Sequence, residues 1–109
     1  MTRTALQEFT RSASEDDLLT AITEAMTLFG WLWTHTRRSD KAQIMGHPGV
    51  PDIIAARRGR LLFLELKSAG GTLTEGQLAW KLAMPPDSRA VTYMLVYPAD
   101  LDVVLGMLR

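Results

Sequence analysis

The chain has 109 residues, 47% of them hydrophobic, and its formal net charge is zero. It has no cysteine, which excludes a disulfide scaffold and a thiolate zinc site. No apolar run approaches the roughly 20 residues that would span a bilayer. We therefore expect one folded domain with no membrane partner, located in the cytoplasm of a bacterium or of the host cell of a phage.

The first half of the chain predicts an arm, a helix, a strand and a loop. Residues 1–13 are expected to form a loosely ordered arm, and residues 14–109 the domain. A helix is predicted from Glu15 to Phe29, because apolar residues recur at helical spacing and Gly30 follows as a stop signal. Residues 31–37 alternate aromatic and polar side chains, as in a strand, and residues 38–51 are rich in Gly, Pro and charge, as in a loop.

The second half predicts a hairpin followed by a helix, a strand and a closing helix. The predicted hairpin strands are residues 52–57 and 61–67, joined by a tight turn at Arg58-Gly59. A helix over residues 74–84 ends at two prolines, and residues 90–97 read as a strand. A last helix starts near Ala99. The order α-β-β-β-α-β-α predicts an α/β fold with a central mixed sheet flanked by helices.

The register of this hairpin places three charged residues together. A two-residue turn puts Arg57 opposite Arg60, and the same register puts Asp52 opposite Glu65. Cross-strand neighbours lie about 4.5–5.5 Å apart at Cβ. Side chains alternate along a strand, so Lys67 shares a face with Glu65. A turn one residue longer would shift this register.

Glu65 and Lys67 interrupt the otherwise apolar run LLFLELK. One explanation is a surface ion pair on a wet strand end, worth less than about 1 kcal/mol. Asp52 favours another explanation, because two carboxylates about 4 Å apart repel by roughly 4 kcal/mol at an effective dielectric of 20. A divalent cation such as Mg²⁺ would offset that repulsion, and the Lys67 ammonium could contact a phosphate.

Charge is unevenly distributed along the neutral chain. Residues 1–34 carry a net −3, residues 35–60 a net +4 and residues 61–109 a net −1. This positive stretch predicts contacts with nucleic-acid phosphates, although a solvated loop and hairpin tip would explain it equally well. Its basic residues are Arg37, Arg38, Lys41, Arg57, Arg58 and Arg60.

The segment GHPGVPDIIAARRGRLLFLELKSAGGTLTEGQLAW resembles the core of the VRR-NUC (virus-type replication-repair nuclease) domain, a branch of the PD-(D/E)XK superfamily. The matching pieces are Pro51-Asp52, Glu65-Leu66-Lys67, a Gly-rich turn and a helix carrying Gln77. The likeness extends over about residues 14–109. It departs from the family pattern at residues 85–87, Pro-Pro-Asp, where the resemblance would lead one to expect a helix that continues to a glycine turn.

This resemblance implies a restriction-endonuclease-like fold similar to that of Holliday-junction resolvases, and hydrolysis of DNA with Mg²⁺ or Mn²⁺. It implies that Asp52, Glu65, the Leu66 carbonyl and Glu15 hold the metal, while Lys67 acts on the scissile phosphate. Glu15 alone is also explained by the preference for acids in a first helical turn. Gln77 is either a residue of the active site or only the fourth residue of the capping box Thr74-Glu75-Gly76-Gln77.

The substrate is then expected to be branched or flapped DNA in replication, repair or recombination. The alternative is a nuclease-fold DNA-binding accessory protein without turnover. We also expect a homodimer, because two active sites are needed to cut two strands and large apolar residues are abundant. His35 and His47 are read as structural or exposed, with His35 a possible phosphate contact. Core packing is the expected role of Trp31, Trp33 and Trp80.

Overall fold

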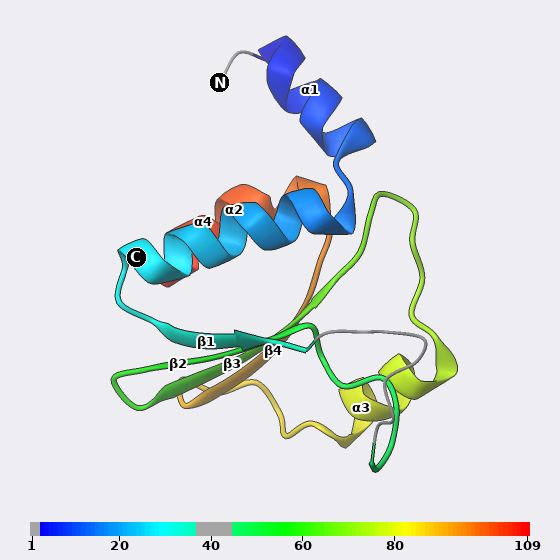
Figure 1. The fold of residues 1–109 in the computed structure, drawn as a ribbon, viewed down its shortest axis with the longest axis vertical. Coiled ribbons are helices and arrows are strands. Elements are labelled where there is room, and N and C mark those ends of the chain that lie inside the picture. Colours follow the sequence, from blue (N-terminus) through cyan, green and yellow to red (C-terminus); the bar gives the residue numbers. More distant parts are fainter. Residues whose placement is uncertain (1–2, 37–44) are drawn as a thin grey trace.

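The computed structural model describes residues 3–36 and 45–109. The elements follow one another as helices, strands and one short 3₁₀ turn (Figure 1). They are α1 (Arg3–Ser12), α2 (Glu15–Leu28), β1 (Leu32–His35), β2 (Ile53–Arg57), β3 (Arg60–Leu66), α3 (Glu75–Ala83), β4 (Val91–Val96), η1 (Pro98–Asp100) and α4 (Leu101–Leu108).

A single four-stranded sheet, in the order β1-β2-β3-β4, forms the centre of the molecule. The pairs β1–β2 and β2–β3 are antiparallel, whereas β3 and β4 are parallel and are connected through α3. Helices α2 and α4 lie side by side over one face of the sheet, and α3 lies on the other side (Figure 1). The expected α/β class with a mixed sheet is therefore confirmed.

The β2–β3 hairpin has the register predicted from its turn. Arg57 pairs with Arg60, and the ladder continues to Ile53 opposite Leu64. Arg58 and Gly59 at the turn have φ angles of 49° and 78°. Two successive positive φ values are typical of a type I′ turn, which matches the twist of the flanking strands.

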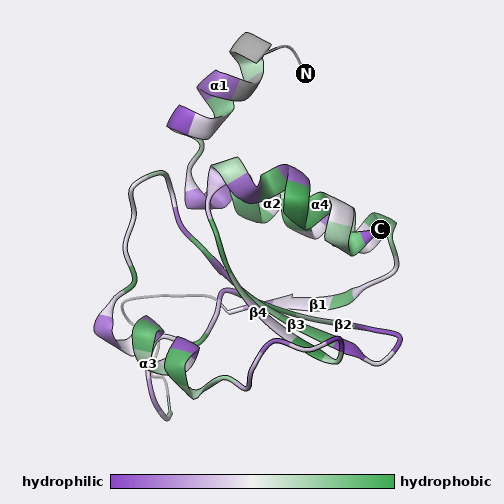
Figure 2. Cartoon of the chain, turned by 180° about the vertical axis from the view of Figure 1, so that it is seen from behind, coloured by the Kyte–Doolittle hydropathy of each residue, from purple (hydrophilic) through white to green (hydrophobic). Residues whose placement is uncertain are grey.

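The core lies between the sheet and the α2–α4 layer. Leu62 and Leu64 are fully buried and Leu66 is 2% exposed, so these alternate residues form the core face of β3. They pack in one cluster with residues of α2 and α4, among them Ile22 and Val104. The hydrophilic hairpin tip and the largely hydrophobic α4 stand out in Figure 2. Because Leu62, Leu64 and Leu66 are buried toward α2 and α4, Glu65 lies on the opposite face of β3.

Helix α2 begins and ends at residues with clear structural reasons. The Ser14 hydroxyl accepts from the Asp17 N–H, and the Asp17 carboxylate accepts from the Ser14 N–H, which forms a capping box. At the other end Gly30 has φ 80°, and Trp31 N–H donates to Met26 O at 2.8 Å. This Schellman-type ending needs a residue that tolerates positive φ. Glu15 is thereby fixed at the first turn of α2.

The structure corrects the expectation at the start of the chain and agrees with the one at its end. Residues 3–12 form α1 rather than a loosely ordered arm, and Phe9 packs against the core cluster. The closing helical segment starts with η1 at Pro98 and continues as α4 from Leu101, which agrees with the expected start near Ala99. The first strand spans Leu32–His35, which is shorter than predicted.

Part of the expected DNA-contacting loop lies outside the described residues, including Arg37, Arg38 and Lys41. Within residues 3–36 and 45–109, no helix has the length and apolar character needed to cross a membrane.

Candidate functional site

Asp52 lies immediately before β2, where the ladder between β2 and β3 ends. Its Oδ2 accepts a hydrogen bond of 2.8 Å from the Leu66 N–H, in place of a backbone carbonyl of the neighbouring strand. Because Ile53 pairs with Leu64, the next step of the register brings Asp52 opposite Glu65. The sequence prediction that these two carboxylates lie on neighbouring strands at one end of the hairpin thus agrees with the observed register.

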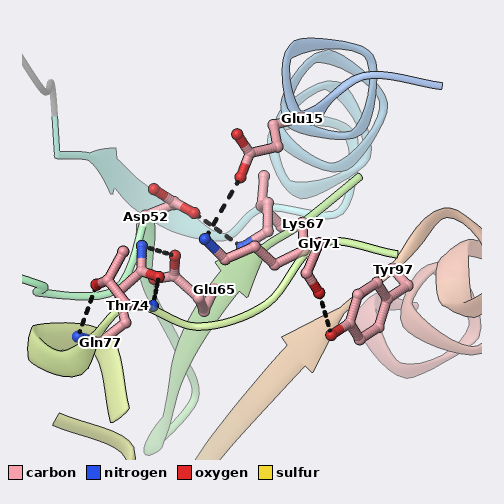
Figure 3. A network of polar contacts seen from close by, with 9 residues as sticks. Glu15, Asp52, Glu65, Lys67, Gly71, Thr74, Gln77 and Tyr97 are labelled. Atoms are coloured by element: carbon pink, nitrogen blue, oxygen red, sulfur yellow. Dashed lines mark hydrogen bonds and ion pairs between the residues drawn. The ribbon is translucent and has the colours of Figure 1, made fainter. Parts of the chain in front are cut away.

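Glu65 is the most deeply buried acid of the cluster, with 1% of its surface exposed. Its Oε1 accepts a hydrogen bond of 2.7 Å from the Gln77 Nε2. Burying an ionised carboxylate is costly unless donors compensate it. The α3 helix supplies such a donor directly to β3 (Figure 3).

Gln77 completes the predicted capping box and also contacts Glu65, whereas its role in an active site stays a prediction. Its Oε1 accepts from the Thr74 N–H at 2.9 Å, and Thr74 Oγ1 accepts from the Gln77 N–H at 3.2 Å, so the capping box is complete. At the same time its Nε2 reaches Glu65, and Gln77 is 1% exposed. The amide therefore connects the start of α3 to the carboxylate on β3.

Lys67 and Glu15 meet across the gap between β3 and α2. The Lys67 Nζ lies 4.0 Å from Glu15 Oε1, with Lys67 9% exposed and the Glu15 side chain 54% exposed. A contact of this length with a half-exposed acid contributes little to stability. Figure 3 shows the side chains of Glu15, Asp52, Glu65 and Lys67 converging on one region. The structure thus brings these four predicted residues together.

The electrostatic influence of the two acids extends to β4. Burial, followed by the negative charges of Glu65 and Asp52, raises the pKa of the Tyr93 phenol from 10.0 to about 12. Tyr93 pairs with Phe63 in the parallel ladder and thus lies close to Glu65 on the sheet. Tyr93 was not singled out from the sequence. Its place near Glu65 depends on the parallel register of β4 with β3, which did not follow from the sequence.

A cavity of about 200 Å³ opens beside Asp52. It is lined by Glu15, Asp16, Leu19, His35, Thr36, Asp52 and Leu66, so three acids border it. A larger cavity of about 600 Å³ lies against α3 and is lined mainly by apolar groups. We take the smaller one as the candidate site because Asp52, Glu15 and Leu66 border it and none of them borders the larger.

The donor groups suit a hydrated divalent cation better than a preformed cage. Within the described part of the chain, no three acidic or histidine side chains are close enough together to hold a metal ion as they stand. Mg²⁺ keeps several waters and commonly uses only one or two carboxylates. Asp52 and the buried Glu65 fit that requirement, and Glu15 could complete it from α2. The role of the Leu66 carbonyl as a metal ligand stays a prediction.

The described arginines of the positive stretch lie at the other end of the hairpin. Asp52 and Arg57 are five residue steps apart along the strand, which corresponds to roughly 17 Å. The Arg57 guanidinium donates to Phe29 O and Arg109 O and stacks 4.5 Å from the Trp31 ring centroid. Arg60 donates to Arg89 O, whereas Arg58 is exposed at the turn. The structure does not bring Arg57, Arg58 and Arg60 to the carboxylates.

The tryptophans differ in their surroundings. Trp31 is 4% exposed and donates from Nε1 to Leu108 O, so its expected core role is confirmed. Trp33 is 41% exposed and donates to the Thr27 hydroxyl, which corrects the expectation that it packs in the core. Trp80 is half-buried beside the larger cavity.

Comparisons of the chain with family models, with curated proteins and with solved structures find no match. What the site can do is therefore inferred from its geometry, its donor groups and the order of its motifs.

Proposed function

We propose that the protein is a metal-dependent DNA endonuclease of the PD-(D/E)XK type, with Asp52, Glu65 and Lys67 at its active centre. The observation that carries the proposal is the buried carboxylate of Glu65, 1% exposed, on the strand next to Asp52 and two residues from a buried lysine. Burying a carboxylate next to a second acid costs free energy, because the charge loses its hydration and the two acids repel each other. A cation bound by both acids would offset that cost.

Each residue of the cluster then has a chemical task. Asp52 and Glu65 supply hard oxygen ligands, which are the ligands that Mg²⁺ and Mn²⁺ prefer. When bound, the cation would acidify the attacking water and neutralise charge that develops on the phosphate. Lys67 carries a positive charge in a largely water-free position, where it stabilises the negative charge of a phosphate most effectively. Gln77 holds the Glu65 carboxylate in orientation.

The fold is compatible with this assignment. The antiparallel β2–β3 hairpin carries Glu65 on β3 and Asp52 directly before β2, and the parallel strand β4 follows it. Glu15 begins the helix that packs across this sheet, 4.0 Å from Lys67. It is the natural source of a further oxygen ligand.

A DNA-binding accessory protein without turnover is the second candidate. It is favoured by one observation, since no preformed three-residue metal group exists among the described residues. A protein that only binds DNA, however, has no need for a buried acid beside a phosphate-binding lysine.

Cleavage of a panel of labelled DNAs tests the two candidates. Purified protein is incubated with junction, flap, single-stranded and duplex DNA, with Mn²⁺ or with EDTA. The nuclease proposal predicts products only with the cation and more from junctions or flaps than from plain duplex. Binding of all four DNAs without products, at any concentration of Mn²⁺, would favour the accessory protein.

A further inference from the structure

The backbone carbonyl of Asp52 is held by the end of β1. It accepts from the Thr36 N–H at 3.0 Å and lies 2.8 Å from the His35 Nδ1. A carbonyl oxygen can only accept, so Nδ1 carries the proton and donates. The Thr36 hydroxyl donates to Pro51 O at 3.0 Å, one residue earlier, and is only weakly placed toward Asp52 O, at 3.5 Å.

The side chain of the same residue is held from the opposite strand. Asp52 Oδ2 accepts from the Leu66 N–H at 2.8 Å. Asp52 is thus fixed at its backbone by β1 and at its carboxylate by β3. A carbonyl oxygen has two lone pairs, and two donors restrain the peptide plane more strongly than one. That plane adjoins the Asp52 Cα and so sets the direction of its side chain.

We propose that His35 is a positioning residue, whose Nδ1–H locks the Asp52 peptide so that the Asp52 carboxylate stays on the Leu66 N–H and beside Glu65. Thr36 alone would keep β1 and β2 together, because its N–H continues the ladder. The imidazole adds the second donor. His35 also lines the cavity that Asp52 and Glu15 border.

This geometry distinguishes an asparagine from other replacements of His35. The asparagine Nδ2 lies the same number of bonds from Cα as the histidine Nδ1, so His35→Asn retains a donor near that position. His35→Gln carries its amide one bond further, and His35→Ala removes the donor. A side chain that merely fills space would not discriminate between asparagine and glutamine in this way.

Amide hydrogen exchange at Leu66 and Lys67 provides the test. The Leu66 N–H binds Asp52, whereas the next amide, of Lys67, binds Val96 O at 2.9 Å on the other side of β3. We expect His35→Ala to accelerate Leu66 exchange about tenfold, as for one weakened hydrogen bond, and to leave Lys67 unchanged. His35→Asn should restore protection of the Leu66 amide, whereas His35→Gln should not. Asp52→Ala removes the acceptor and should abolish this protection completely.

Two outcomes would overturn the proposal. Equal acceleration of both amides would mean general loosening of the sheet, and equal behaviour of His35→Asn and His35→Gln would mean that no donor is needed. His47→Asn is the matched control, because His47 is exposed in the loop and should leave both amides unchanged. If His35→Ala does not fold, the comparison of asparagine with glutamine still decides.

The catalytic consequence rests on the proposed nuclease function. For a nuclease, we expect His35→Ala to lower kcat with little change of KM for DNA, and His35→Asn to recover it. The exchange measurement does not need activity. A wild-type protein that cuts no DNA would therefore contradict the nuclease proposal, while the Leu66 amide would still report on His35.

Discussion

The pair Glu65–Gln77 joins the candidate site to the stability of the fold. One amide side chain caps α3, through Thr74, and holds a carboxylate that is 1% exposed. Hydrogen bonds to charged groups contribute more than neutral ones, about 1.5–3 kcal/mol each. A residue with this double role should therefore matter to stability even without a ligand.

Replacement of Gln77 by alanine is expected to lower the free energy of unfolding by about 2–3 kcal/mol, because Glu65 loses its Nε2 donor and Thr74 N–H loses its acceptor. Urea denaturation measures the change. Lys81→Ala is the control, since Lys81 is exposed on the same helix. Equal stabilities of the two variants would mean that the Gln77–Glu65 contact does not form in solution.

Tyr93 offers a pH-dependent probe of the two acids. Its pKa is about 12, raised from 10.0 by burial and by the charges of Glu65 and Asp52. The folded state therefore retains a proton that the unfolded state loses, so stability due to Tyr93 is complete below about pH 10 and falls as pH rises toward 12.

Absorbance titration of a Tyr97→Phe variant, which leaves Tyr93 as the single tyrosine, should give a midpoint well above 10. In the same background Glu65→Gln should lower the midpoint, since one of the repelling charges is removed. A midpoint unaffected by Glu65→Gln would contradict the proximity of the two side chains.

At the residue scale, contacts that follow from the register of one hairpin could be predicted from the sequence. Contacts that depend on how distant elements pack could not. The facing of Asp52 and Glu65 followed from a two-residue turn and from side-chain alternation. The contact of His35 with Asp52 O depended on how β1 pairs with β2, which no local pattern encodes. Tyr93 required the parallel pairing of β4, and Gln77 reached Glu65 only because α3 lies on the side of the sheet opposite α2 and α4.

Among the elements, the segment 45–51 and α3 approach each other through two glycines. A Cβ at Gly49 would lie 2.3 Å from the Gly76 backbone carbon, and one at Gly76 would lie 2.9 Å from Pro48 O. This close packing presses the segment before Asp52 against the start of the helix that carries Gln77. The segment that leads into Asp52 therefore packs directly against the helix whose Gln77 contacts Glu65.

Gly49→Ala is expected to destabilise the protein by more than Gly46→Ala. Both glycines have positive φ, 92° and 99°, but a Cβ at Gly46 would meet nothing within 4 Å. The difference between the two thermal melting temperatures isolates the contact with α3 from the strain of the backbone. Equal losses in the two variants would show that the approach to Gly76 is not needed.

Most elements could be predicted because their signals are local. The apolar spacing of α2, the Arg58-Gly59 turn and the two prolines after α3 each act within a few residues. Helix α1 was missed although Leu6 and Phe9 recur at helical spacing, because the segment is polar on average and Phe9 packs against the core cluster only in the tertiary fold. The short β1 was overestimated, since its length depends on where β2 begins opposite it.

For the whole molecule, the central question is how a neutral chain would hold DNA. Among the described arginines, Arg57 and Arg60 already bind backbone carbonyls far from the carboxylates. Trp33, Leu28 and Leu32 are exposed around the edge strand β1. Twofold symmetry is the commonest arrangement of a homo-oligomer, and we propose that a second copy supplies further basic groups for DNA.

We expect a homodimer at micromolar concentration, with DNA affinity that falls steeply as salt increases. Sedimentation velocity measures the mass, and the affinity is measured between low and physiological salt. Trp33→Ala should shift the mass toward the monomer if β1 is part of the dimer interface, since Trp33 lies in this edge strand and is partly exposed. A monomer mass with full cleavage activity at the same concentration would contradict the dimer.

The most direct measurement of the central claim is the rate of Mn²⁺-dependent DNA cleavage by the wild type, by Glu65→Gln and by Glu75→Gln. Glu75 is an exposed acid on α3 and serves as the matched control. We expect Glu65→Gln to lower the rate by more than about a hundredfold, since even outer partners of a metal site cost about 10- to 100-fold. Glu75→Gln should cut at the wild-type rate. Equal rates for all three proteins would contradict an active centre at Asp52, Glu65 and Lys67.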